Sequence, residues 1–118
     1  MLSPIAAALI QRPREQGPFD GFTHYGVSGV PGDGPYVELW LQVQNGVIRR
    51  ASFKTPGCPS SMAAALMLCS LAEGRDPARL QQLSAEELLT VLGGLPEGKE
   101  HYASRAILAM KDAIRGDQ

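Results

Sequence analysis

The chain has 118 residues, with 11 Lys and Arg against 12 Asp and Glu, and a formal net charge of -1. Hydrophobic residues make up 44% of it and charged residues 19%, which excludes a disordered or collagen-like chain and predicts a single domain over residues 1–118. The balanced charge argues against nucleic-acid or membrane binding, which usually requires a basic excess.

The unbroken apolar run nearest the N-terminus covers residues 5–10 and is far shorter than the ~18 residues of a membrane-spanning helix. No Lys or Arg precedes this run, so we do not expect a signal peptide. Cys58 and Cys69 are the two cysteines of the sequence, too few for a disulfide framework. A reduced, cytoplasmic protein is therefore the expectation.

The N-terminal third of the chain predicts a short helix, a strand and a loop. Residues 4–11 suit a helix, with a proline at the first turn. Residues 22–28 have moderate strand character. Residues 29–35 hold three glycines and two prolines, and this composition predicts a loop.

A β-hairpin follows, in which residues 36–43 alternate apolar and polar side chains and pair with a return strand over residues 47–54. We favour a three-residue loop over residues 44–46, closed by a left-handed glycine at a bulge. This register places apolar residues opposite one another, as in Leu39 with Ala51, whereas a two-residue loop would place Leu39 opposite a polar residue.

Helices dominate the second half of the chain. The first of these helices should be buried, since its apolar residues lie on nearly every side of it. The third of them is predicted to begin with a capping box. The predicted helices cover residues 59–73, a short segment from 76–77 onward, residues 85–92 and residues 100–115. Strands followed by helices predict an α+β fold with helices on one face of an antiparallel sheet.

Cys58 is the residue best placed for chemistry. Pro59 suits the first position of a helix, so Cys58 falls at the N-cap, where backbone N–H groups and the helix dipole favour a thiolate. The two strands of the hairpin are antiparallel, so the segments before residue 36 and after residue 54 leave the sheet at the same end. We therefore expect Asp33 to lie near Cys58.

Two histidines, His24 and His101, could complete a site around Cys58 and Asp33, because Cys sulfur, His nitrogen and Asp oxygen all bind zinc or iron. Each residue also has an ordinary structural interpretation. Asp33 suits a Gly-Asp-Gly turn, and a histidine is commonly a surface or capping residue. Cys69 is expected to be a small buried hydrophobic residue.

Four segments, taken in order over about residues 12–115, resemble the NifU/IscU-type iron–sulfur cluster assembly scaffold, the NifU-like N-terminal domain. R-P-R-E-Q-G at 12–17 resembles the family's N-P-x-N-V-G, and F-K-T-P-G-C at 53–58 resembles its F-K-x-x-G-C. G-L-P-E-G-K at 94–99 looks like the L-P-P-V-K loop that chaperones bind. The segment 101–114 is similar to the helix that begins with His-Cys in family members.

The resemblance implies a fold of three antiparallel strands with helices packed on one face. It implies a scaffold rather than an enzyme, one that receives sulfur from a cysteine desulfurase, assembles a 2Fe–2S cluster and is bound by a chaperone. The family's site uses three cysteines and a nearby Asp or His. Here Cys58 matches the second cysteine, His101 matches the histidine beside the third, and Tyr102 occupies the third cysteine's position.

Asp33 can be aligned in two ways. Without gaps it falls on the first cysteine's position; aligned on the Gly-Asp pair it is the family's aspartate, and Pro31 replaces the cysteine. Either way, Cys58, Asp33 and His101 form the candidate site for a metal ion or cluster, with iron or a 2Fe–2S cluster implied by the resemblance and zinc as an alternative. A single cysteine departs from the four thiolates that usually hold such clusters.

Three hypotheses follow. The first is a diverged scaffold that binds iron or zinc, or accepts sulfur, at a single-cysteine site. The second is a non-catalytic binding or regulatory module that retains the surface for a desulfurase or chaperone without building a cluster. The third is a thiol enzyme with Cys58 as nucleophile, His101 as base and Asp33 as orienting residue.

Overall fold

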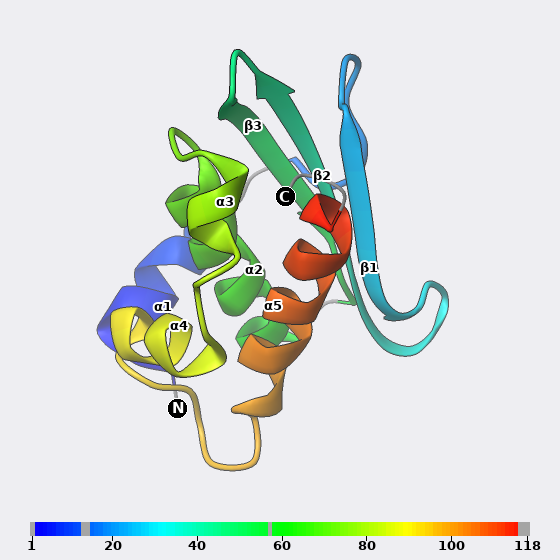
Figure 1. Ribbon diagram of the computed structural model, residues 1–118. Helices are drawn as coiled ribbons and strands as arrows, with labels where there is room; N and C mark the ends of the chain where they lie inside the picture. Colours follow the sequence, from blue (N-terminus) through cyan, green and yellow to red (C-terminus); the bar gives the residue numbers. More distant parts are fainter. Residues whose placement is uncertain (1, 13–14, 57, 116–118) are drawn as a thin grey trace.

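The computed structural model describes residues 2–12, 15–56 and 58–115. The described elements, in chain order, are α1 (Pro4–Ile10), β1 (His24–Val30), β2 (Asp33–Gln44), β3 (Val47–Lys54), α2 (Pro59–Ala72), α3 (Pro77–Leu80), α4 (Ala85–Leu92) and α5 (His101–Ile114). The strands form one antiparallel sheet in the order β1-β2-β3, and the helices gather on one side of it (Figure 1). The α+β fold with a three-stranded sheet is confirmed.

The helical layer is held to the sheet by α2 and α5, while α1, α3 and α4 lie further from the strands (Figure 1). Apolar side chains of the sheet, such as Leu39, Leu41 and Phe53, are fully buried against these two helices. One face of α5 is buried as well, including Ala106 and Met110. Burial of this kind stabilises a fold by about 25 cal/mol per Å² of apolar surface.

α2 is buried nearly all round, as its composition predicted. Three consecutive alanines, Ala63, Ala64 and Ala65, have no exposed surface, which is the result of packing α2 between the sheet and the outer helices. Small side chains permit this close approach on every face. Cys69 is fully buried in the same helix, so its predicted role as a core residue is confirmed.

The register predicted for the β2–β3 hairpin is wrong. The turn has two residues, Asn45 and Gly46, both with positive φ (54° and 75°), as a type I′ turn requires. A β-bulge interrupts the pairing after the two residue pairs next to the turn. It shifts the register of the remaining pairs by one residue, so that Leu39 lies opposite Phe53. An extra residue in β3 therefore restores the apolar faces to the same side, which no uninterrupted register could do with a two-residue turn.

The loop predicted over residues 29–35 is also shorter than expected. β1 continues to Val30 and β2 begins at Asp33, joined through Pro31 and Gly32. Gly32 has a φ of 82°, which suits the third residue of a type II turn, and Pro31 suits the second. The strand predicted over residues 22–28 begins at His24.

The sheet face opposite the helices is partly covered, and Trp40 is only 6% exposed there. The ring of Tyr25 lies 5.4 Å from the Trp40 ring, and its hydroxyl donates to Glu38 at 2.8 Å. Burial, this hydrogen bond and the negative charge of Glu38 raise the pKa of Tyr25 to about 12. The chain before β1 lies along β3, where the Gly17 N–H donates to the Phe53 carbonyl at 2.9 Å.

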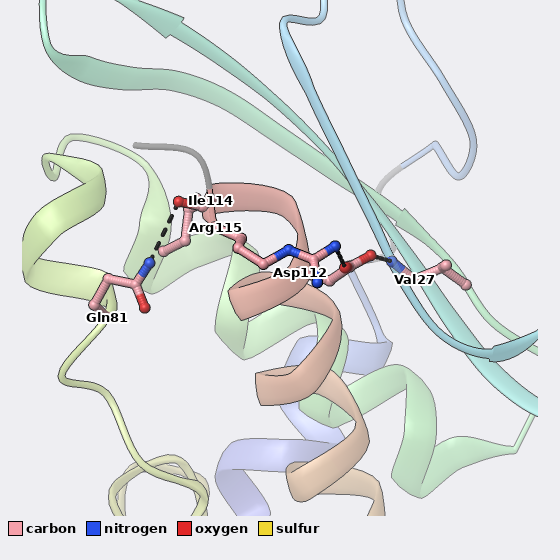
Figure 2. Close-up of polar contacts among 5 residues, drawn as sticks. All are labelled: Val27, Gln81, Asp112, Ile114 and Arg115. Carbon is pink, nitrogen blue, oxygen red and sulfur yellow. Dashed lines mark hydrogen bonds and ion pairs between the residues drawn. The ribbon is translucent and has the colours of Figure 1, made fainter. Parts of the chain in front are cut away.

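α5 packs closely on β1, and Gly26 makes this possible. A Cβ on Gly26 would lie 2.1 Å from the Ala109 carbonyl oxygen. Asp112 then joins the two elements: its carboxylate accepts a hydrogen bond from the Val27 backbone N–H at 3.0 Å and pairs with Arg115 at 2.7 Å (Figure 2). None of the helices in the described part of the chain is long and apolar enough to cross a membrane.

Candidate functional site

A pocket of about 310 Å³ lies where the start of β2, the β3–α2 connection and the start of α5 meet. Its lining residues are Gly34, Pro35, Pro56, Cys58, Ser61 and Tyr102. The segments that precede and follow the hairpin thus emerge at the same end of the sheet, as the antiparallel pairing predicted. The thiol of Cys58 is partly buried in this pocket.

Local structure fixes Cys58 at the end of α2. Cys58 is the N-cap with extended backbone angles, and its carbonyl accepts from the Met62 N–H at 3.0 Å. Thr55 fastens the connection to the sheet, because its hydroxyl donates to the Tyr36 carbonyl at 2.8 Å and lies 2.5 Å from the buried Ser61 hydroxyl. The thiol therefore projects from a well-anchored helix end; Gly57 of the predicted motif lies outside the described residues.

The surroundings of Cys58 favour the thiolate. Burial raises the pKa of the Cys58 thiol, and the backbone N–H groups of Ser61 and Ser60 lower it. A hydrogen bond from the Tyr102 hydroxyl and the positive charge of Lys99 lower it further, so the pKa lies below its ordinary value.

Tyr102 is the complementary partner of the thiol. Burial and the neighbouring Cys58 raise the pKa of Tyr102, more than the positive charge of Arg105 lowers it. The phenol therefore stays protonated and can donate to the sulfur. Its ring lies 4.2 Å from the ring of His101 and 5.9 Å from the Lys99 ammonium, contacts that restrict its orientation.

The three predicted site residues are not gathered in one cluster. Cys58 lines the pocket, whereas Asp33 and His101 are exposed and each lies next in sequence to a lining residue, Gly34 or Tyr102. Among the described residues, no group of three or more His, Cys, Asp or Glu side chains could hold a metal ion. The donor set therefore does not fit a preformed metal or cluster site in this structure.

Sequence reasoning missed the groups that act on the thiol. In the sequence, Tyr102 stands at the third cysteine's position and Lys99 belongs to the segment 94–99, and neither position indicates a contact with the thiol. The spacing of these two residues held a signal, because residues three apart at a helix start lie on the same side. The structure shows that turn: the Tyr102 N–H donates to the Lys99 carbonyl at 3.1 Å.

The fold and site define a small α+β domain that presents one activated thiol at the end of a buried helix. Its sequence matches the NifU-like N terminal domain over residues 5–116, and the chain belongs to that family.

Relatives and solved structures agree with this assignment. The chain is 30% identical over 105 residues to the iron-sulfur cluster assembly scaffold protein IscU of Aquifex aeolicus, covering 87% of this chain and 67% of that protein. It is 28% identical over 104 residues to the scaffold protein IscU 1 of Archaeoglobus fulgidus, covering 88% and 68%. The crystal structure of a NifU-like N-terminal protein from Brucella abortus has the same fold, with a TM-score of 0.70 over 96% of this chain and 91% of that one, at 14% identity.

Proposed function

We propose that this chain is a diverged scaffold-type protein of iron–sulfur cluster assembly that accepts sulfur on Cys58 as a persulfide. The observation that carries the proposal is the pocket in which Cys58, the single cysteine there, has a lowered pKa and a phenol donor beside it. Membership of the NifU-like family and the names of the scaffold relatives support the pathway.

The chemistry needs no group beyond the donor. The Cys58 thiolate attacks the terminal sulfur of a donor persulfide, and a new S–S bond forms on Cys58. The S–S bond of the donor breaks, and the donor leaves as a thiolate, so no external oxidant or reductant is required. Tyr102 is then placed to donate to sulfur on Cys58, and Lys99 to balance its negative charge.

We also propose that the site can hold a metal ion or cluster. Iron, a 2Fe–2S cluster or zinc would be cargo held by Cys58, with Asp33 and His101 as further ligands. The support is the position of Asp33 and His101, because each is the immediate sequence neighbour of a residue that lines the pocket. Because the side chains are not gathered, the surrounding segments would have to move before all three could reach one ion.

The remaining parts of the proposal follow from the same role. We take the chain as a single scaffold domain over residues 1–118 that carries sulfur or metal rather than catalysing a reaction. Its proposed partners are a cysteine desulfurase and a chaperone, the latter at residues 94–99, and its proposed location is the cytoplasm. The thiol-enzyme hypothesis is less favoured, because no hydrogen bond joins His101 to Cys58 in the described ranges.

The test is transfer of sulfur from a desulfurase. Reduced wild-type protein is incubated with a bacterial cysteine desulfurase and L-cysteine, and the persulfide is trapped by alkylation and located by peptide mass spectrometry. We expect one added sulfur on Cys58, none on Cys69, and none in Cys58→Ser. Absence of sulfur on wild-type Cys58, or equal loading of Cys58→Ser, would refute the proposal. Elemental analysis of untagged protein after anaerobic addition of iron tests the metal branch separately.

A second candidate is a binding or regulatory module that retains the scaffold surface but does not load sulfur. The observation that favours it is the ungathered set of potential ligands. In that case Cys58→Ala and wild-type protein would bind the desulfurase equally, and neither would acquire sulfur. A requirement for Cys58 in loading would exclude this candidate.

A further inference from the structure

The two edges of the sheet are closed by different means. At the β3 edge, other segments of the chain supply backbone partners. The Ile48 N–H donates to the Arg75 carbonyl at 2.8 Å, and the Phe53 carbonyl accepts from the segment before β1. β1 forms the opposite edge of the three-stranded sheet (Figure 1). It is the edge at which this sheet can still gain a strand, because no other segment of the described chain pairs with it along its length.

One side chain meets the backbone at the β1 edge. The Val27 N–H donates to the Asp112 carboxylate of α5 at 3.0 Å, so this N–H is not part of the β1–β2 ladder (Figure 2). Arg115 pairs with the same carboxylate at 2.7 Å. Alternate residues of an antiparallel strand direct their backbone groups to the same side, so the Tyr25 N–H also points outward. Within the described ranges, no group accepts from that N–H.

The β3 edge uses a carboxylate in the same way. Glu73, at the end of α2, accepts from the Ala51 N–H at 3.1 Å. At both edges, therefore, an acidic side chain near the C-terminal end of a helix binds an N–H of an edge strand. A charge placed on a strand edge opposes edge-to-edge pairing, because an added strand would bury that charge.

The surroundings of the β1 edge favour pairing once the carboxylate is removed. A depression of about 430 Å³ lies between β1 and α5, and Leu108 on its α5 side is 58% exposed. Tyr25 and Val30 of β1 are 41% and 62% exposed. Apolar side chains beside unpaired backbone groups are typical of an edge that adds strands. A second β1 fits this edge, because an antiparallel edge strand matches its own copy in a twofold-symmetric pair.

We propose that the hydrogen bond between Asp112 and Val27 is an autoinhibitory contact that prevents a second copy of this chain from adding its β1 to the sheet. An incoming strand would have to place a carbonyl oxygen at the Val27 N–H, where the Asp112 carboxylate lies. The Asp112 side chain, which is 30% exposed, would lose both its backbone donor and its contact with water. Burying a carboxylate without its donor opposes the pairing.

The inference does not rest on the proposed sulfur chemistry. Tyr102, beside the Cys58 thiol, lies in the first turn of α5, and Asp112 lies in the last. The two residues are roughly 15 Å apart along the helix axis, at about 1.5 Å per residue. Association at β1 and sulfur loading at Cys58 can therefore fail independently of each other.

The test is sedimentation velocity of the full chain over a wide range of protein concentrations. Wild type should sediment as a monomer, whereas Asp112→Ala should form a dimer as the concentration rises. The association constant should increase on the order of tenfold or more, the factor that one charge-assisted hydrogen bond per copy represents. Amide hydrogen exchange locates the contact, since the Tyr25 and Val27 amides of Asp112→Ala should become more protected as the dimer forms.

Three variants separate an opened edge from a general loss of stability. Ser84→Ala removes the capping hydroxyl of α4 and destabilises the fold without touching β1, so it should remain monomeric. Asp112→Asn retains an acceptor oxygen and should also remain monomeric. Val27→Pro/Asp112→Ala lacks the N–H that an added strand needs and should return to the monomer, because proline is tolerated where the N–H of an edge strand faces outward.

If Asp112→Ala does not fold, hydrogen exchange of the wild-type monomer decides the question. Its Val27 amide should exchange more slowly than its Tyr25 amide, since Asp112 protects the first and nothing in the described chain protects the second. Equal exchange of the two amides would overturn the inference. So would an Asp112→Ala protein that stays monomeric at every concentration, equal association of Ser84→Ala, a dimer that persists in Val27→Pro/Asp112→Ala, or a wild-type dimer protected along β1.

Discussion

The contact between Tyr102 and Cys58 makes the sharpest prediction. Tyr102→Phe keeps the ring and removes the hydroxyl that donates to the thiolate. A sheltered hydrogen bond to a charged group contributes about 1.5–3 kcal/mol. Cys58 is partly exposed, so water replaces part of this contribution, and we expect a thiolate population roughly two- to fivefold lower at pH values below the pKa.

The assay is the rate of iodoacetamide alkylation of Cys58 against pH, followed by peptide mass. Because the hydroxyl lowers the pKa, its removal should move the midpoint of the profile to higher pH, and the two rates should converge above both midpoints. Tyr36→Phe is the matched control and should leave the profile unchanged. An unshifted profile for Tyr102→Phe, or a shift to lower pH, would refute the assignment of Tyr102 as the thiolate's donor.

Three further predictions concern the sheet. Gly26→Ala should destabilise the fold by about 3 kcal/mol in urea unfolding, since its Cβ would meet the Ala109 carbonyl at 2.1 Å; an unchanged midpoint would contradict the close packing of β1 on α5. Asp112→Ala should cost about 1–2 kcal/mol by leaving the Val27 N–H without its partner, whereas Asp112→Asn, which retains an acceptor oxygen, should cost less; equal losses would argue against this hydrogen bond. Tyr25 has a folded-state pKa of about 12, above its unfolded value, so its contribution to stability is present below about pH 10 and is lost as the pH rises towards 12. Tyr25→Phe should therefore lose less stability than wild type as the pH rises from about 10 towards 12. If alkaline unfolding experiments show equal losses for the two proteins, Tyr25 does not cause the loss of stability.

Local sequence patterns were sufficient for most of the elements. The capping box of Ser84 and Glu87, the proline at the start of α2 and the alternation along β2 each depend on residues within a few positions of one another. Such patterns predict helix starts and strand faces directly. The expected approach of the β2 start to the β3–α2 connection also held, since antiparallel pairing alone requires it.

Long-range packing decided what these patterns could not. The bulge in β3 follows from matching the apolar faces of two strands to one helical layer, and a turn motif does not encode it. Trp40 occupies one of the alternate positions of β2 on the sheet face opposite the helices, yet it is only 6% exposed, and the Tyr25 ring lies 5.4 Å from its own.

At the site, the sequence by itself determined that one thiol stands at the start of a buried helix, because Pro59 suits the first helical position and the residues after it are apolar nearly all round the helix. Only the tertiary structure decided which groups surround that thiol. It brought Tyr102 and Lys99 to Cys58 from more than 40 positions away in the sequence and left the side chains of Asp33 and His101 outside the pocket. The physical reason is that helix and turn signals act over a few residues, whereas side chains meet across elements through the packing of the whole core.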